Sequence, residues 1–172
     1  MPTNNLKPKV PSHGGPELKD IVTSAEAALL DMESDYEIWV AEDVRKISEF
    51  LAGAKNCAKN SSKSNVTNSS NKGQDGEEKF IEEIHAIGHN IKGQAATFNF
   101  PLLTSAAKSL CHFIQEDEAT AGKRLDLVEA HVNAMKIIIS QKIKGSGGDM
   151  GRGLITALEK AVDKILAAEN KL

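Results

Sequence analysis

The chain has few of the residues that would indicate a disulfide-stabilised, membrane-spanning or secreted protein. Only two of its 172 residues are cysteines, Cys57 and Cys111, and their separation fits neither a metal site nor a redox motif. No apolar run approaches the ~20 residues that span a bilayer, and the N-terminus lacks the apolar stretch of a signal peptide. We therefore expect free thiols in a reducing cytoplasm and no membrane partner.

The net charge bears on the expected partner, and the composition bears on the fold class. The formal net charge is −3, which argues against nucleic acid as the main partner. Only 4% of the residues are aromatic, and few segments alternate β-branched and polar residues, so strands are not expected. A chain of this length can bury one substantial core. We predict a single all-α domain.

Composition divides the chain into three regions. Residues 1–16 hold four of the five prolines and are predicted to be a flexible tail. Residues 17–143 carry apolar residues at helical spacing, except at 56–75, where Asn, Ser, Lys and Gly dominate and predict a disordered loop. Residues 144–172 are predicted to form a glycine-rich linker, Gly145–Gly153, followed by an amphipathic C-terminal helix.

Apolar spacing predicts five helices within residues 17–143. They run from Leu18 to Met32, from Tyr36 to Leu51, from Glu77 to Phe98, from Pro101 to Ile114 and from Lys123 to Ile143. The last four should form an antiparallel four-helix bundle, with additional helices at the two ends. We expect a break near Asp31–Asp35 and a turn over Glu116–Gly122. Trp39 is expected in the core or at its boundary.

The joint after the third of these helices has a specific chemistry. Asparagine tolerates the left-handed conformation that often ends a helix, so Asn99 predicts a helix end. Proline suits the first turn of a helix, so Pro101 predicts the start of the next one. A sharp joint at this place makes the two helices an antiparallel hairpin.

His89 lies opposite the apolar stripe of the segment 77–98. At about 100° per residue it is roughly 140–200° from the isoleucines of that stripe. Lys92 flanks it, and Gly88 and Gly93 bracket it, although glycine inside a helix costs about 1 kcal/mol relative to alanine. The glycines suggest that space is needed around the ring. An exposed imidazole beside a cation, with no bulk around it, suits transient phosphorylation by a docked partner. The stripe consists of Phe80, Ile84, Ile87, Ile91 and Phe98.

Two other interpretations of His89 compete with this one. A histidine on a helix surface often has no role at all. Glu82, His85 and His89 also fall at i, i+3 and i+7 on one face and could bind a metal, although such sites normally draw ligands from more than one element. His112 and His131 show no paired spacing.

Residues 89–98 resemble the signature of histidine phosphotransfer (Hpt) domains. In that signature the histidine is followed by a hydrophobic residue, a lysine–glycine pair and small residues. The run 95–100 is similar to the phosphorylatable domain of chemotaxis histidine kinases. Residues 110–114 and 127–132 are similar to single-domain Hpt proteins of the alphaproteobacterial type. The specific motif covers about 84–114.

The resemblance implies a phosphocarrier in two-component signal transduction. His89 would be the phosphoacceptor, Lys92 would stabilise the phosphoryl group and Gly93 would give the partner access. The implied partners are receiver domains of response regulators or a hybrid histidine kinase, with Mg²⁺ bound by the receiver and no cofactor on this chain. ATP-dependent kinase activity is not expected, because no nucleotide-binding glycine motif is present. Partner contacts are expected at His85, Gln94 and Ala96.

Two residues depart from the family pattern. Asn99 stands where the family usually has glycine, and asparagine can end the helix in the same way. Cys111 stands where chemotaxis kinases have a glutamate that orients the imidazole, so either another group orients His89 or solvent alone does. The alternative function is a helical interaction or scaffold protein that is not phosphorylated.

Overall fold

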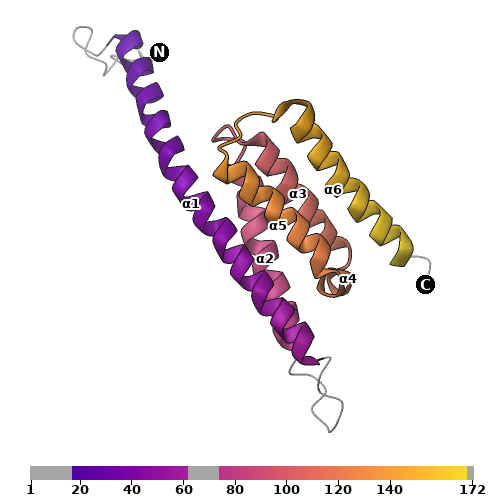
Figure 1. Cartoon of the computed structure of the whole chain (residues 1–172). Coiled ribbons are helices and arrows are strands. Elements are labelled where there is room, and N and C mark those ends of the chain that lie inside the picture. Colours follow the sequence, from indigo (N-terminus) through magenta and orange to yellow (C-terminus); the bar gives the residue numbers. More distant parts are fainter. Residues whose placement is uncertain (1–16, 62–73, 170–172) are drawn as a thin grey trace, which may run out of the picture. The chain divides into compact units, whose positions relative to one another are not determined.

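The protein is all-α. The computed structural model describes residues 17–61 and 74–169, and none of these residues lies in a strand. The helices are α1 (Leu18–Ser61), α2 (Gln74–Gln94), α3 (Pro101–Glu116), α4 (Glu118–Lys123), α5 (Leu125–Ser140) and α6 (Gly148–Glu169) (Figure 1). No helix within the described residues is long and apolar enough to cross a bilayer.

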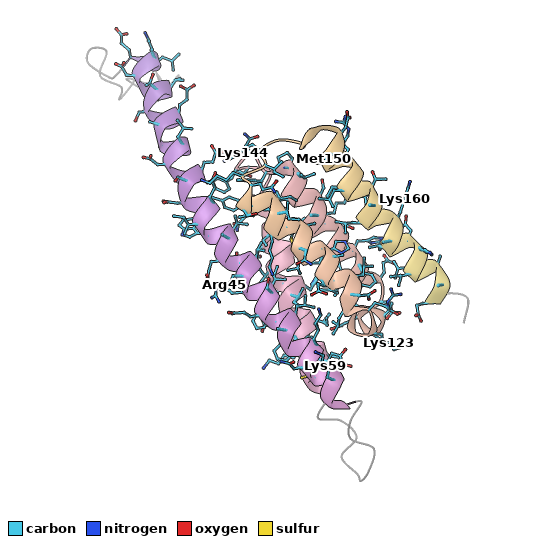
Figure 2. The ribbon with its side chains drawn as sticks, viewed as in Figure 1. Arg45, Lys59, Lys123, Lys144, Met150 and Lys160 are labelled. Carbon is cyan, nitrogen blue, oxygen red and sulfur yellow. The ribbon has the colours of Figure 1, made fainter. Side chains whose placement is uncertain are left out.

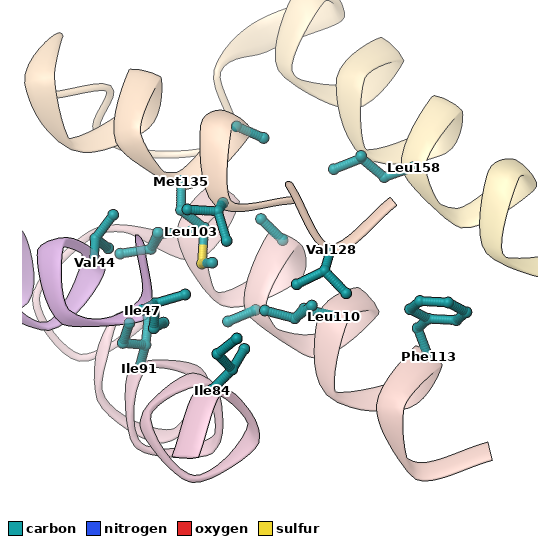
Figure 3. Close-up of a cluster of buried hydrophobic side chains, with 14 of the residues drawn as sticks. Val44, Ile47, Ile84, Ile91, Leu103, Leu110, Phe113, Val128, Met135 and Leu158 are labelled. Atoms are coloured by element: carbon teal, nitrogen blue, oxygen red, sulfur yellow. The ribbon is translucent and has the colours of Figure 1, made fainter. Parts of the chain in front are cut away.

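The contacts divide the chain into two units, residues 1–35 and residues 36–172. The second unit is a helical bundle in which α3 packs against α2, α5 and α6 (Figure 1). Aliphatic side chains from several helices meet in its core, including Val44, Ile84, Leu110 and Val128 (Figure 3). The part of α1 in this unit joins the same core through residues three or four apart. These are Tyr36, Val40, Val44, Ile47, Leu51 and Ala54.

The break predicted near Asp31–Asp35 is wrong, because α1 runs through it without interruption. The segment contains neither glycine nor proline, and its acidic side chains can remain in solvent on a helix surface. The expectation for Trp39 is also wrong, since its side chain is 62% exposed. Tyr36 and Val40 lie on the buried face of α1, whereas Trp39 lies beside that face.

The joint between α2 and α3 has the predicted chemistry. Asn99 takes the left-handed conformation, with φ of 63°. The Phe100 N–H donates to the Ala95 carbonyl (2.8 Å), and the Asn99 N–H donates to the Ala96 carbonyl (3.2 Å), which is the Schellman motif of a helix end. Pro101 opens α3. The predictions for Asn99 and Pro101 are therefore confirmed.

The end of α5 repeats this geometry beside the first joint. Lys142 has φ of 49°, and the Gly145 N–H donates to the Asn99 carbonyl (3.0 Å), so the two helix ends are joined through their backbones. Glu37 forms ion pairs with Lys142 and Lys144, each at 2.7 Å. Figure 2 labels Lys144. Hydrogen bonds from these two lysines hold the pKa of Glu37 below its usual range.

Several predicted boundaries need correction. The segment predicted as a turn, Glu116–Gly122, contains most of α4, because Asp117 caps that helix by accepting a hydrogen bond from the Thr120 N–H (3.0 Å). The predicted linker Gly145–Gly153 contains the start of α6. The amphipathic helix that the sequence predicts here is present, and it packs on the bundle of its own chain through apolar residues at helical spacing. They are Ile155, Leu158 and Val162.

The predicted loop 56–75 is helical at both ends. α1 continues to Ser61, and Ala58 in this extension still packs against the core. α2 already begins at Gln74. Because these residues are mostly polar, the apolar spacing gave no sign that the two helices extend into the segment. The rest of the predicted loop, 62–73, and the predicted tail, 1–16, lie outside the described residues.

Candidate functional site

The sequence motif lies on α2, whose two sides have different surroundings. One side is buried in the bundle, and His89 is exposed on the other, as the spacing predicts. The site is therefore on the surface of a helix that the core holds in place. The buried positions of α2 and of the turn after it are Ile81, Ile84, Gly88, Ile91 and Ala95.

The surface around His89 is open on the side of Gly93. A Cβ built on Gly93 would meet no atom of the described residues within 4 Å. Gln94 and Ala96 are also exposed, whereas Lys92 is half-buried beside them. A partner could therefore approach His89 from this side without displacing a side chain.

The His89 ring has no hydrogen bond or ion pair to the parts of the chain that the structure describes. The sequence left open whether another group orients the ring. Within 17–61 and 74–169 no hydrogen bond or ion pair orients the ring. An unpartnered imidazole keeps both nitrogens available for chemistry with a docked molecule.

Gly88 does not clear space around His89, contrary to our interpretation of the sequence. It is buried against α3, where a Cβ would lie 3.4 Å from Cys111 Sγ and 3.8 Å from Leu110 Cδ2. The glycine thus lets α2 and α3 approach each other directly behind the histidine. Only a knowledge of the neighbouring helix could have separated its role from that of Gly93.

Cys111 occupies the space under α2 that the resemblance assigns to an orienting carboxylate. Its thiol is buried and lies 4.0 Å from the His85 carbonyl oxygen. Burial raises its pKa, so the thiol stays neutral at pH 7. It contacts the backbone of α2 and takes no part in holding the His89 ring.

His85 lies on the same side of α2 as His89, one turn earlier. The two ring centroids are 6.3 Å apart, and the His85 Nε2 is buried without a hydrogen-bond partner. Burial, followed by the charges of His89 and Lys92, lowers the pKa of His85, while Glu118 acts in the opposite direction. His85 is therefore a neutral ring at the edge of the site, half-buried where the sequence suggested a contact residue.

No three His, Cys, Asp or Glu side chains converge to hold a metal ion within the described parts of the chain. Glu82, His85 and His89 share the helix spacing that suggested such a site. Their arrangement on one helix does not bring in a ligand from a second element.

The other two described histidines have different environments. His131 is fully buried; its Nδ1 donates to the Leu127 carbonyl (2.8 Å), and the Ser109 hydroxyl donates to its Nε2 (2.9 Å). Burial lowers the pKa of His131, which keeps the ring neutral. His112 is exposed on α3, with Nδ1 3.5 Å from Glu116. The place of His131 on an apolar helix face was the signal for its structural role.

No protein-family model matches this chain, and neither the curated proteins nor the solved structures contain a match.

Proposed function

We propose that this chain is a histidine phosphotransfer protein that shuttles a phosphoryl group between receiver-domain aspartates in a phosphorelay. The observation that carries the proposal is the exposed, unpartnered His89 ring beside the open surface at Gly93. A surface of this kind gives a large partner access to a nucleophile. The resemblance of residues 89–98 to the Hpt signature supports the same function.

The proposed chemistry needs little beyond a nucleophile and a nearby cation. The lone pair on Nε2 of His89 attacks the phosphorus of a receiver's aspartyl phosphate. The bond from phosphorus to the aspartate oxygen breaks, and the aspartate leaves as a carboxylate. The aspartate of a second receiver then takes the phosphoryl group from the phosphohistidine. Lys92 offsets the charge of the phosphoryl group, and the receiver supplies its Mg²⁺.

The proposed partners are receiver domains of response regulators or of a hybrid histidine kinase, which places the protein in the cytoplasm. They would dock over α2, with Gln94 and Ala96 at the exposed contact and His85 at its edge. The chain would act as a phosphocarrier with no ATP-dependent kinase activity of its own. This chain would supply the nucleophile and a cation, and the receiver would supply the aspartate and the metal ion.

Phosphotransfer from purified receiver domains tests this proposal. A panel of receivers is phosphorylated with labelled acetyl phosphate, freed of the donor and mixed with this chain. We expect an acid-labile, base-stable label on the wild type and on His112→Gln, and none on His89→Gln. His112 is the matched control, because it is also an exposed histidine in the bundle. Equal labelling of His89→Gln would contradict the proposal, and no labelling by any receiver would favour a helical interaction protein.

A further inference from the structure

The segment of α1 from Leu18 to Asp35 exposes a series of large apolar side chains. Contiguous apolar surface of this kind marks an interaction site, whereas single exposed residues need no explanation. The exposed fractions are 77% for Leu18, 50% for Ile21, 46% for Val22, 66% for Leu30 and 52% for Met32.

Most of these residues belong to one continuous stripe. At about 100° per residue, they lie within roughly 60° of the direction in which Ala25 points. The stripe is therefore about 120° wide and, at about 1.5 Å per residue, roughly 22 Å long. These are the dimensions of a helix face that packs against another element. Its members are Leu18, Ile21, Val22, Ala25, Ala28 and Met32.

Acidic residues flank this stripe on both sides. Glu26 and Glu33 lie roughly 80–100° from its centre on one side, and Asp20, Asp31 and Asp35 lie roughly 80–140° from it on the other. With Lys19 as the single basic residue, residues 18–35 carry a net charge of −4, whereas the whole chain carries −3. The acidic excess of the chain is therefore concentrated along this stripe.

We propose that the stripe on residues 18–32 binds a partner helix whose own apolar seam is flanked by lysine and arginine. The charge pattern selects this partner. A second copy of the chain would bring two acidic rows against each other, which is destabilising. An anionic membrane surface would repel the same rows. The inference does not depend on the function proposed for His89.

Two synthetic helices test the proposal on the full chain. Both have leucine at the heptad a and d positions; one has lysine and the other has glutamate at e and g. We expect calorimetric titration to detect binding of the lysine helix, at least about tenfold weaker at 0.5 M than at 0.05 M salt. The glutamate helix should not bind.

Variants then locate the binding surface. The double variant Val22→Ser/Met32→Ser should weaken binding of the lysine helix by about tenfold or more, which corresponds to about 1.4 kcal/mol. Ile137→Ser is the matched control, because Ile137 is an apolar residue of α5 that is 47% exposed. It should bind like the wild type. Both proteins should keep the wild-type thermal unfolding of the bundle, since all three side chains are exposed.

Three results would overturn the proposal. The first is a dimer of the chain alone, in sedimentation velocity, that dissociates in Val22→Ser/Met32→Ser, because the occupant would then be a second copy. The second is equal binding of the lysine and glutamate helices, which would mean that charge does not select the partner. The third is binding to phosphatidylcholine vesicles that the double variant loses, which would assign the stripe to a membrane surface.

Discussion

The thiol of Cys111 on α3 lies directly under Gly88 on α2, 3.4 Å from the position that a Cβ on residue 88 would take. This contact sets the spacing of the two helices immediately behind His89. The glycine before the histidine therefore serves the bundle, whereas the glycine four residues after the histidine faces open space. A large side chain should therefore destabilise the fold at position 88 and be tolerated by the fold at position 93.

Gly88→Ala should be tolerated. The added methyl group would be at ordinary contact distance from Cys111 and Leu110, and alanine is the better helix former by about 1 kcal/mol. The free energy of unfolding, measured by urea denaturation, should stay the same or rise by up to that amount. Gly88→Leu should instead lower it by about 1–3 kcal/mol, because the larger side chain overpacks the interface. A stable Gly88→Leu protein would show that α2 and α3 can separate here at little cost.

Gly93→Gln should separate stability from phosphotransfer. The new side chain enters open space, so the fold should be unchanged or more stable by up to about 1 kcal/mol. The same side chain would stand where the proposed receiver would approach His89, so the transfer rate should fall. Ala96→Gln should have the same effect in a milder form. Thermal unfolding and transfer kinetics on the same samples are the measurements. Normal transfer by a stable Gly93→Gln protein would mean that no partner docks over this surface.

Lys92→Ala should slow phosphotransfer without preventing it. Lys92 is half-buried beside the site, but the receiver's metal ion would neutralise most of the phosphoryl charge. We expect the barrier to rise by about 1.5–3 kcal/mol, the range for a hydrogen bond to a charged group. Lys92→Arg, which retains the charge, should recover part of the rate. Wild-type kinetics in Lys92→Ala would make this lysine an ordinary surface residue.

Loss of the Ser109 hydroxyl should destabilise the bundle. Ser109→Ala leaves the buried His131 Nε2 without a donor, which costs about 1–3 kcal/mol in the free energy of unfolding. Denaturation of Ser109→Ala and of Ser105→Ala gives the comparison. Ser105 is the control, because its hydroxyl is bonded to a carbonyl of its own helix at an exposed position. Equal stability of both variants would show that the hydrogen bond to His131 contributes little.

Stability should fall as the pH decreases below about 6.5, the ordinary pKa of histidine. The pKa of His131 is lowered in the folded protein, so the unfolded chain binds the proton first. The contribution of the neutral ring is therefore complete above about pH 6.5 and is lost as the pH falls towards the lowered folded value. The pKa of His85 is lowered too and acts with the same sign. The fall between pH 7.5 and 5.5 should be smaller in His131→Leu than in the wild type.

Local chemistry made much of the fold predictable. Asn99 and Pro101 fix the joint between α2 and α3 through backbone preferences that depend on few neighbours. Charge was a poorer guide, because the acidic residues Asp31–Asp35 interrupt the hydrophobic pattern without interrupting α1. That segment contains neither glycine nor proline, the two residues that disfavour a helix interior most strongly.

The site was predictable only where a single helix determines it. The exposure of His89 and the space at Gly93 follow from the face of α2 on which they lie. The surroundings of Gly88 and the burial of His85 Nε2 depend on where α3 and α4 pack. The residue spacing within α2 gives no information about those positions.

Because the His131 ring is buried, its N–H proton can report whether the bundle is folded. The proton on Nδ1 is hydrogen-bonded to the Leu127 carbonyl and shielded from water, so it exchanges with solvent only when the bundle opens. A proton on the exposed His89 ring exchanges freely. In a magnetic resonance spectrum, a persistent imidazole N–H signal from His131 therefore monitors whether the interior stays closed during assays of the proposed phosphotransfer at His89. A variant that loses transfer but keeps this signal has a defect at its surface.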